Sequence, residues 1–527
     1  MISLLSLLAA FSFFIYRRMK RLLRYLQQDD YIPSRFVRWF VEKKAFDMRG
    51  SAVALCGGAI SLLGWEATPW MALGYLVIGL MENNPEKSGK MPLKMTARAK
   101  RILWVASAMP ALCFAMLLLL FYRFFPAWPA ALLISQAVPL YLLAAVAVLS
   151  IDETRRQRRF MEEAKKRLLD VNPLVIGITG SYGKTTTKHF LSKLMQQSLG
   201  PTFFPGKGVN TPMGITREIR ERLKDRTPYA VVEMAAYGKG SIHRLTKLTP
   251  PRGAILTIIG KAHLERFGSQ EMIRKTKAEL AEAVPEDGFL VLNGDDPLCR
   301  KIGLENPKKA VLYYGYSEDL GPLDLKMTLL KSGAAGTEVE FLWRGKPYTA
   351  TVSLHGKPII ANLGSAFLTV CHLGADPAFV TALLPHLEAY DNRLQVRREG
   401  DITVLHDAYN SNPSGFKAAV DVLASVDGKR RILMTPGMIE LAEEQEKENE
   451  EVAFASAKVA DLALIVGETN REALKRGLLK GGMSPENILF FKGRDEAFHY
   501  LKDNRKEGDV LLIENDLLDL HEAKEAF

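Results

Sequence analysis

The stretch Val175–Lys188, V-I-G-I-T-G-S-Y-G-K-T-T-T-K, combines residue types that can bind a nucleotide phosphate. Glycines separate a β-branched run from a helical pattern, so the expected order is strand, glycine loop and helix. Backbone N–H groups of such a loop attract anions together with the helix N-terminus. Lys184 is expected to reach the β- and γ-phosphates of ATP, and Thr185 to hold Mg²⁺. The predicted loop residues are Gly180, Ser181, Gly183, Lys184, Thr185 and Thr186.

Two further groups of the kind that bind Mg²⁺ follow predicted strands. Glu233 ends the apolar run Tyr229–Glu233, and His263 follows the run Gly253–Thr257. The carboxyl ends of parallel strands converge on the crevice where nucleotides bind. A carboxylate and an imidazole at that edge could hold Mg²⁺ between ATP and a substrate. A single histidine after a strand is more often structural, so the metal hypothesis depends on the combination with the phosphate loop.

The elements that position these residues alternate between strand and helix. This alternation predicts an α/β domain with a parallel sheet over residues 172–385 and a second, smaller doubly wound α/β domain over residues 386–527. The other predicted strands are Gly288–Leu292, Ile402–Leu405, Arg431–Met434, Leu462–Val466, Ile488–Phe491 and Val510–Ile513.

Six segments from Asn172 onward closely resemble the Mur ligase family. They are G-I-T-G-S-Y-G-K-T-T-T-K, V-V-E-M-A-A, A-H-L-E-R-F-G-S, N-G-D-D-P, N-R-L-Q-V and H-D-A-Y-N-S-N-P-S. Within the family, the chain most resembles the branch that adds D-alanyl-D-alanine to the UDP-muramoyl tripeptide of peptidoglycan. The resemblance implies a central P-loop ATPase domain, a Rossmann-like C-terminal domain and an ATP-dependent amide ligase that works through an acyl-phosphate and releases ADP.

The resemblance also implies roles for single residues. Lys277 matches the lysine that family members carbamylate to stabilise a second Mg²⁺, with an ordinary solvent-facing lysine as the alternative. Asn362 matches the asparagine at the adenine, and Arg393 and Asp407 would contact the nucleotide once the domains close. The implied catalytic residues are Lys184, Lys277, His263 and Arg393, and the implied metal ligands are Thr185, Glu233, His263 and Lys277.

A polar segment in the C-terminal domain completes the implied site. Tyr409, Asn410 and Asn412 match the substrate-side segment of the family, although the same residues could form a turn and a helix cap. The last strand, by contrast, ends in E-N-D and lacks the K-G-S-type segment that is usual near the amine substrate. The identity of the amine substrate therefore stays open.

Residues 1–150 hold apolar stretches with basic flanks, which predict an all-α, multi-pass transmembrane region of about five helices. With the N-terminus outside, every basic loop would lie in the cytoplasm, which places the protein in the inner (cytoplasmic) membrane with its catalytic domains in the cytoplasm. Residues 151–171 would form a basic helical connector. The alternative is that these segments are the buried core of a soluble domain. The apolar stretches are Met1–Tyr16, two arms of Ser51–Met81, Ile102–Phe125 and Ala130–Ile151.

Charge and cysteine content indicate which classes of binding partner and cofactor the chain can have. The net charge of +11 gathers beside apolar segments and is not interleaved with aromatic residues, which favours anionic lipid over nucleic acid. The four scattered cysteines form no C-x-x-C pair, so neither a zinc ribbon nor a disulfide framework is indicated.

Three functions follow from these observations. The first is a membrane-anchored ligase that joins a small-molecule or lipid-linked peptide or sugar substrate to an amino acid or dipeptide, within a membrane-bound envelope-synthesis complex. In this hypothesis the membrane region replaces the UDP-sugar-binding domain of the family. The second is a peptide polymerase of the poly-γ-glutamate kind. The third is an ATP-binding membrane sensor or transporter, although the apolar segments carry few of the polar groups that a substrate path needs.

Overall fold

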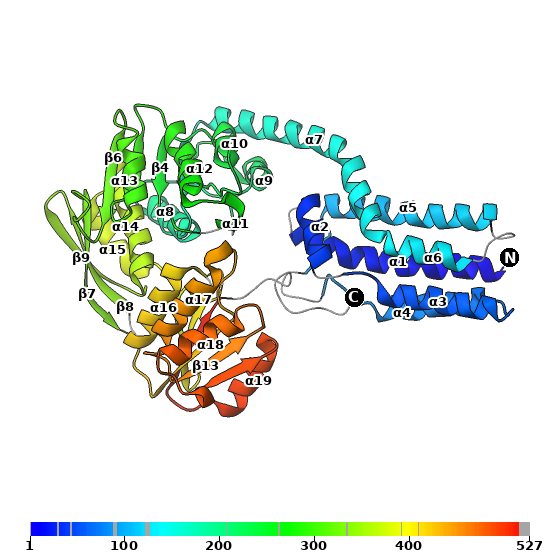
Figure 1. Cartoon of the computed structure of the whole chain (residues 1–527). Coiled ribbons are helices and arrows are strands. Elements are labelled where there is room, and N and C mark those ends of the chain that lie inside the picture. Colours follow the sequence, from blue (N-terminus) through cyan, green and yellow to red (C-terminus); the bar gives the residue numbers. More distant parts are fainter. Residues whose placement is uncertain are drawn as a thin grey trace. The chain divides into compact units, whose positions relative to one another are not determined.

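The computed structural model of the 527-residue chain describes residues 2–28, 31–42, 45–87, 92–121, 127–206, 208–261, 264–333, 336–390, 393–408 and 411–515. It divides into two compact units, one within residues 1–156 and the other within residues 157–516. Both units are drawn in Figure 1.

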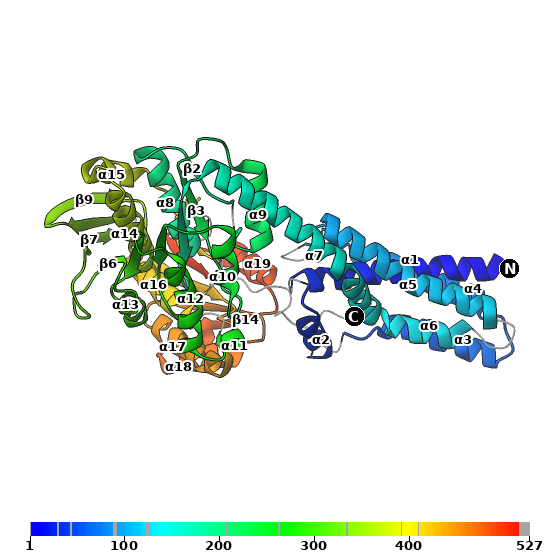
Figure 2. The same ribbon diagram turned by 90° about the horizontal axis from the view of Figure 1, so that it is seen from above.

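The N-terminal unit is a bundle of helices. Helix α1 packs against α4 and α5, while α3 packs against α4 and α6 (Figures 1 and 2). Aromatic rings fill the centre, with the Phe11 ring centroid 4.9 Å from that of Tyr75 and 4.3 Å from that of Phe114. The helices are α1 (Ile2–Gln28), α2 (Pro33–Glu42), α3 (Met48–Leu62), α4 (Thr68–Met81), α5 (Ala97–Phe121), α6 (Ala127–Gln136) and α7 (Val138–Val171).

Three basic residues after Tyr16, Arg18, Arg21 and Arg24, lie buried inside this bundle. Because α1 continues to Gln28, their guanidinium groups face neighbouring helices and loops. Arg18 Nε lies 3.3 Å from Asp47 Oδ2, and Arg21 Nη1 lies 3.2 Å from Glu82 Oε2. All four side chains are buried, and a buried charge is tolerated when it is paired.

The predicted multi-pass region of five crossings is wrong, and so is the placement in the inner membrane that rested on it. In the described part of the chain, one helical stretch, Ala97–Leu119, is long and apolar enough to cross a bilayer. The number becomes two if the bent pair α6 and Val138–Ser150, which meet at 58°, is taken as one span. Helices α3 and α4, with 15 and 14 residues, are shorter than the ~20 residues that a span needs.

The predicted connector, residues 151–171, is the second half of helix α7. This helix runs unbroken from Val138 to Val171. It begins just before Pro139, a residue that is favoured in the first turn of a helix because its missing N–H has no partner to lose there.

Nine strands form the sheet of the central domain, in the order β2-β3-β1-β4-β5-β6-β7-β8-β9. Strand β1 pairs in parallel with β3 on one side and with β4 on the other, so the carboxyl ends of these three strands meet. The bounds are β1 (Leu174–Thr179), β2 (Thr202–Phe203), β3 (Tyr229–Glu233), β4 (Gly253–Leu256), β5 (Phe289–Asn293), β6 (Ala310–Gly315), β7 (Leu325–Gly333), β8 (Gly336–Trp343) and β9 (Lys346–Val352).

Helices and loops connect these strands and cover the sheet (Figure 1). They include α8, which follows the glycine loop, and α12, which carries Lys277. The helices are α8 (Lys184–Ser198), α9 (Pro212–Arg222), α10 (Ser241–Leu248), α11 (Leu264–Phe267), α12 (Gln270–Ala283), α13 (Pro297–Leu304), α14 (Lys357–His372) and α15 (Pro377–Leu383), with the 3₁₀ helix η1 (Leu384–His386).

Strands β7 to β9 form an antiparallel extension that the sequence analysis did not predict. Alternate side chains of β8 are buried, which is the pattern of a strand with one face on a core. Arg344 and Gly345 connect β8 and β9 with φ values of 50° and 73°, as a tight two-residue hairpin requires. The Phe341 ring stacks on Phe367 of α14 at 4.9 Å, so the extension packs on the helix that carries Asn362.

The C-terminal domain has a six-stranded sheet in the order β10-β11-β15-β12-β13-β14, parallel except for β10. The predicted doubly wound α/β fold is confirmed here. The strands are β10 (Gln395–Glu399), β11 (Ile402–Asp407), β12 (Arg430–Thr435), β13 (Leu462–Val466), β14 (Ile488–Phe491) and β15 (Asp509–Glu514). The helices are α16 (Pro413–Ser425), α17 (Gln445–Ser456), α18 (Arg471–Lys480) and α19 (Arg494–Asn504), with the 3₁₀ helices η2 (Ala442–Glu444) and η3 (Pro485–Asn487).

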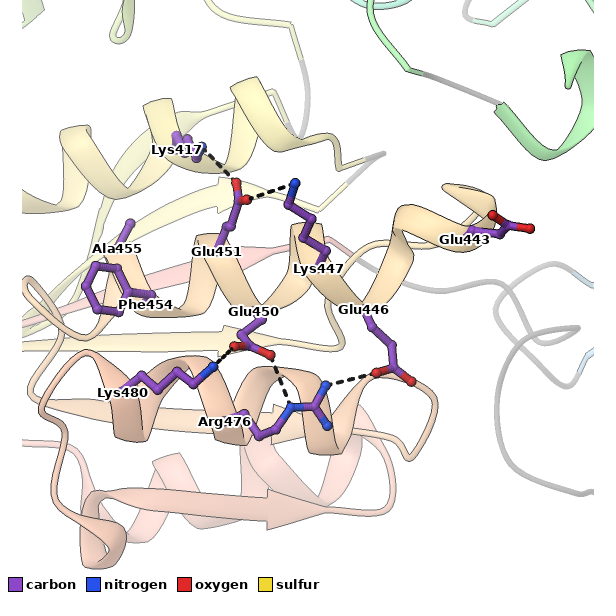
Figure 3. A pocket seen from close by; sticks show the side chains of 10 residues that line it. All are labelled: Lys417, Glu443, Glu446, Lys447, Glu450, Glu451, Phe454, Ala455, Arg476 and Lys480. Carbon is purple, nitrogen blue, oxygen red and sulfur yellow. Dashed lines mark hydrogen bonds and ion pairs between the residues drawn. The ribbon is translucent and has the colours of Figure 1, made fainter. Parts of the chain in front are cut away.

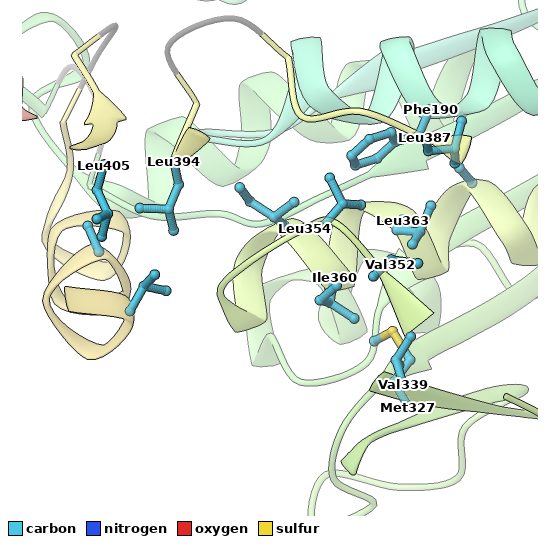
Figure 4. Close-up of a cluster of buried hydrophobic side chains, with 14 of the residues drawn as sticks. Phe190, Met327, Val339, Val352, Leu354, Ile360, Leu363, Leu387, Leu394 and Leu405 are labelled. Atoms are coloured by element: carbon cyan, nitrogen blue, oxygen red, sulfur yellow. The ribbon is translucent and has the colours of Figure 1, made fainter. Parts of the chain in front are cut away.

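A hydrophobic cluster packs around β1 and α8, the elements on either side of the glycine loop. It includes Phe190 of α8, Leu363 of α14 and Val352 of β9, all fully buried (Figure 4). The same cluster continues through Leu394 to Leu405 of β11. Burial of apolar surface at about 25 cal/mol per Å² therefore supports the elements that carry the site.

Candidate active site

The glycine loop begins at the end of β1 and turns into α8. Gly180 and Gly183 have φ values of 151° and 81°, which side-chain-bearing residues rarely adopt. A Cβ on Gly180 would lie 1.9 Å from Thr257 Oγ1, and a Cβ on Gly183 would lie 2.3 Å from Asn362 Oδ1. Gly183 is the N-cap of α8 and makes no side-chain cap bond, so the backbone donors at this helix end can face an anion.

Lys184 folds back on the loop that precedes it. Its Nζ donates to the carbonyl oxygens of Gly180, at 2.8 Å, and Ser181, at 3.2 Å. Desolvation lowers the pKa of Lys184, the carboxylate of Glu233 opposes this shift and the cation of Arg393 adds to it. Lys184, the lysine predicted to bind phosphate, therefore lies close enough to Glu233 and Arg393 for their charges to act on it.

Glu233 is the centre of a hydrogen-bond network at the end of β3. The hydroxyl of Thr185 donates to Glu233 Oε2 at 3.0 Å, and Asn210 Nδ2 donates to Oε1 at 3.1 Å. Lys188 Nζ lies 3.4 Å from Oε2. The carboxylate is 1% exposed, so these groups replace the water that would otherwise solvate it.

Lys277 lies buried on α12, close to the phosphate loop. Desolvation lowers its pKa well below the ordinary value, and repulsion from the Lys184 ammonium lowers it further. The solvent-facing alternative is therefore wrong. A lysine with a depressed pKa is neutral at lower pH and can act as a nucleophile.

The loop after β4 is tied to the phosphate loop. Ser181 Oγ donates to the carbonyl of Gly260 and accepts from the N–H of Gly260, both at 3.0 Å. His263 lies outside the described residues. Among the described residues, no three His, Cys, Asp or Glu side chains gather as a protein-only metal cage needs.

Asn362 and Thr186 lie beside the loop. Asn362 Oδ1 accepts a hydrogen bond of 3.2 Å from Thr187 of α8 and lies against Gly183. This places the asparagine at the phosphate loop, and its contact with the adenine stays a prediction. Thr186 is buried in the first turn of α8.

Two C-terminal residues of the predicted site, Arg393 and Asp407, lie close together. Burial raises the pKa of Asp407 to about 6, and the Arg393 cation opposes the shift. Asp407 ends β11 and pairs in register with Glu514, which ends β15. Burial and the Asp407 carboxyl raise the pKa of Glu514, and Ser411 Oγ donates to this residue at 2.5 Å.

The segment that resembles the substrate side of the family is described only in part. Tyr409 and Asn410 lie outside the described residues. Asn412 is the N-cap of α16, and its Oδ1 accepts from the N–H of Gly415 at 2.9 Å. The helix cap that the sequence allowed is therefore present, while contact with a substrate stays a prediction.

A cavity of about 580 Å³ opens beside the phosphate loop. Its lining includes Tyr182, Gly260 and Asn293 of the central domain, and Pro413, Ser414 and Glu448 of the C-terminal domain. The Tyr182 hydroxyl is buried and has no hydrogen-bond partner among the described residues. A small ligand fits a cavity of this size.

A second cavity is lined mostly by charged side chains that pair with one another. Glu450 forms ion pairs with Lys480 and with Arg476, at 3.1 Å from the latter's Nε, and Arg476 also contacts Glu446 at 2.9 Å (Figure 3). None of the predicted site residues lines it.

Sequence reasoning missed Lys188 and Asn210. Lys188 follows Lys184 by four residues, a helical spacing that places both on one face, and this signal was available in the sequence. Asn210 stands in a loop whose sequence carries no comparable signal. Both residues contact Glu233.

Family comparisons agree with this arrangement of two domains. The Mur ligase middle domain matches residues 178–370, and the Mur ligase glutamate ligase domain matches residues 392–514. Every described site residue above lies within one of these ranges, and Glu514 is the last residue of the second.

Several relatives are described as UDP-N-acetylmuramoyl-tripeptide–D-alanyl-D-alanine ligases. The protein of Bacillus subtilis (strain 168) is 27% identical over 70% of this chain and 78% of its own length. The protein of Mycobacterium tuberculosis (strain H37Rv) is 30% identical over 64% and 69%. The crystal structure of the MurF ligase from Thermotoga maritima in complex with ADP is similar with a TM-score of 0.59 and 27% identity, covering 68% of this chain and 80% of that one.

The fold and the site define an ATP-dependent amide ligase built on a P-loop domain and a smaller α/β domain. The chain belongs to the Mur ligase family. Members of this family use ATP and Mg²⁺.

Proposed function

We propose that this ligase makes a peptidoglycan precursor by joining the carboxylate of a UDP-muramoyl tripeptide to the amine of D-alanyl-D-alanine. The Thr185–Glu233 contact, made where β1 and β3 end side by side, is the observation that carries the proposal. It joins a phosphate-loop hydroxyl to a buried carboxylate, as a phosphoryl-transfer site requires. The two relatives that are described with this activity match 70% and 64% of this chain.

The reaction proceeds in two balanced steps. A carboxylate oxygen of the acyl substrate attacks the γ-phosphorus of ATP, forming an acyl-phosphate and releasing ADP. The amine nitrogen then attacks the acyl carbon, the amide bond forms, phosphate leaves and the amine loses a proton. Lys184 and the loop N–H groups hold the phosphates, and closure of the C-terminal domain brings Arg393 to the nucleotide and keeps water away.

The residues at the loop fit Mg²⁺. Mg²⁺ prefers oxygen ligands and is usually bound by one or two carboxylates together with substrate phosphates. Thr185 and Glu233 supply a hydroxyl and a carboxylate whose oxygens are 3.0 Å apart. When bound, the ion would neutralise charge on the phosphates during transfer. His263 stays a predicted further ligand.

We also propose that Lys277 is carbamylated. The neutral amine attacks CO₂, a C–N bond forms and one proton is released, which converts the neutral amine into an anionic carbamate with carboxylate-like oxygen ligands. Burial and the neighbouring Lys184 lower the pKa of Lys277 and so favour the neutral amine that this reaction needs. Carbon-13 bicarbonate should give a carbamate NMR signal that is lost in Lys277→Met.

We also propose that the adenosine end of ATP enters the 580 Å³ cavity beside the loop; Asn362 does not line this cavity, so this placement is an alternative to the predicted contact of Asn362 with the adenine. The buried hydroxyl of Tyr182 would gain there the partner that the described residues do not supply. Tyr182→Phe should weaken binding of ADP, and an unchanged affinity would contradict this placement.

A product assay tests the activity itself. The full-length chain is supplied with ATP, Mg²⁺, UDP-muramoyl tripeptide and D-alanyl-D-alanine, and the product is identified by mass spectrometry. We expect the UDP-muramoyl pentapeptide together with ADP. Replacement of D-alanyl-D-alanine by other dipeptides and by free amino acids tests the amine substrate.

A further inference from the structure

The carboxylate of Glu233 already has a buried cation beside it. Lys188 Nζ lies 3.4 Å from Glu233 Oε2, and the two side chains are 5% and 2% exposed. Thr185, which donates to the same oxygen, stands three residues before Lys188 on α8. The ammonium and the predicted Mg²⁺ ligands therefore share one carboxylate oxygen.

The position of Lys188 is fixed by a second contact. Its Nζ also donates to the carbonyl of Gly206 at 3.1 Å, in the loop that precedes α9. The side chain thus joins the phosphate-loop helix to that loop as well as to Glu233. Because the ammonium of Lys188 is held by both contacts, it is poorly placed to bind a distant ligand. Its charge therefore acts mainly on Glu233.

Asn210 comes from the same loop and fixes the other oxygen of the carboxylate. Its Nδ2 donates to Glu233 Oε1 at 3.1 Å, while its Oδ1 accepts from the Tyr237 hydroxyl at 3.2 Å. Because the hydroxyl donates to one end of the amide and the carboxylate accepts from the other, the amide has one favoured orientation. Both oxygens of Glu233 are therefore positioned by this loop and α8.

We propose that Lys188 is a built-in counter-cation of the metal site: it neutralises Glu233 in the metal-free protein and thereby limits how tightly a divalent cation binds there. Asn210 is a positioning residue for the same carboxylate. This inference rests on the proposed role of Glu233 as a metal ligand. Its physical basis is that a buried carboxylate without a partner is costly, whereas a cation beside a metal site repels the metal.

The test uses Mn²⁺ alone with the full-length chain, with free Mn²⁺ measured by electron paramagnetic resonance and displaced by Mg²⁺. Lys188→Met keeps the length of the side chain and removes its charge. We expect it to tighten Mn²⁺ binding by about tenfold or more, because a unit charge next to a divalent ion is removed. Lys188→Arg keeps the charge and should bind Mn²⁺ within about twofold of the unchanged protein.

Thermal unfolding gives a second reading of the same variants. Without metal, Lys188→Met should have a lower Tm than the unchanged protein. Added Mg²⁺ should raise the Tm of Lys188→Met by more degrees than it raises the Tm of the unchanged protein. Lys193→Met is the matched control, because Lys193 is an exposed lysine of the same helix. It should change neither Mn²⁺ affinity nor the response to Mg²⁺.

The outcomes separate this inference from the function on which it rests. If Glu233→Gln leaves Mn²⁺ binding unchanged, the metal role of Glu233 is wrong. If Glu233→Gln weakens binding but Lys188→Met leaves it unchanged or weaker, Glu233 is a ligand and the counter-cation role of Lys188 is overturned. A fall in Tm that is equal with and without Mg²⁺ would likewise show that Lys188 has a structural role only.

Discussion

The hydroxyl of Thr185 donates a 3.0 Å hydrogen bond to Glu233 Oε2, joining the phosphate loop after β1 to the end of the neighbouring strand β3. These residues are 48 positions apart in the sequence and meet because the two strands run in parallel side by side. The contact brings the hydroxyl of the glycine loop and the carboxylate that we propose as a metal ligand together.

Thr185→Val should lower ADP formation by at least about 100-fold, because it replaces the hydroxyl with a methyl group of similar size. Thr185→Ser retains the hydroxyl and should keep most of the activity. Both rates are measured with saturating ATP and Mg²⁺. A valine variant that works as fast as the serine variant would show that this hydroxyl does not serve the reaction.

Gly183→Ala should weaken ADP binding and destabilise the fold by about 1–3 kcal/mol, because the new Cβ meets Asn362 Oδ1 at 2.3 Å and the φ of 81° is strained for alanine. Removing the obstacle with Asn362→Ala should recover part of that loss, and a double-mutant cycle measures the coupling. Gly238→Ala is the control, since a Cβ there meets nothing within 4 Å. Additive effects of the two substitutions would contradict the predicted clash.

Lys277→Arg should abolish ligation even though arginine is a basic side chain of similar length. Arginine stays protonated and cannot form a carbamate, whereas burial lowers the pKa of Lys277 and favours the neutral amine. Steady-state product formation across a range of bicarbonate concentrations gives the rate. Activity that survives in the arginine variant would exclude the carbamate role.

Asp407→Asn should change how stability depends on pH. The pKa of Asp407 is about 6 in the folded protein against an ordinary value of 3.8, so the folded state binds the proton more tightly and stability falls as pH rises from about 4 to about 6. Asparagine removes this loss and should stabilise the protein at pH 7 by about 1–3 kcal/mol relative to the unchanged chain. Urea unfolding at several pH values measures the difference.

A second variant, Glu514→Gln, checks the prediction for Asp407. Glu514 is paired in register with Asp407 and titrates with it, so Glu514→Gln should also flatten the dependence of stability on pH. If both variants fall in stability over the same pH range as the unchanged protein, the raised pKa of Asp407 is wrong.

The sequence carried enough information to predict the catalytic half of the molecule. Strands Leu462–Val466 and Ile488–Phe491 were predicted with the bounds that the structure shows. The glycine loop and Glu233 were found because each follows an apolar run whose end defines the edge of a parallel sheet. The local sequence pattern is sufficient to predict a site residue when the motif directly follows its strand in the chain.

The rest depended on contacts between distant residues. Apolar length and basic flanks predict a membrane region, but Arg18 and Arg21 are paired inside a helical bundle with Asp47 and Glu82, which stand 29 and 61 positions later in the chain. Asn210 reaches Glu233 only after the chain folds. Contacts between residues that are distant in the chain produce no local pattern from which a single sequence could predict them.

The most direct test of the central claim is the mass of the product made by the full-length chain from ATP, UDP-muramoyl tripeptide and D-alanyl-D-alanine. Our account predicts the UDP-muramoyl pentapeptide in equal amount with ADP, and none from Glu233→Gln. Release of ADP without the pentapeptide, or a pentapeptide formed equally well by Glu233→Gln, would contradict it.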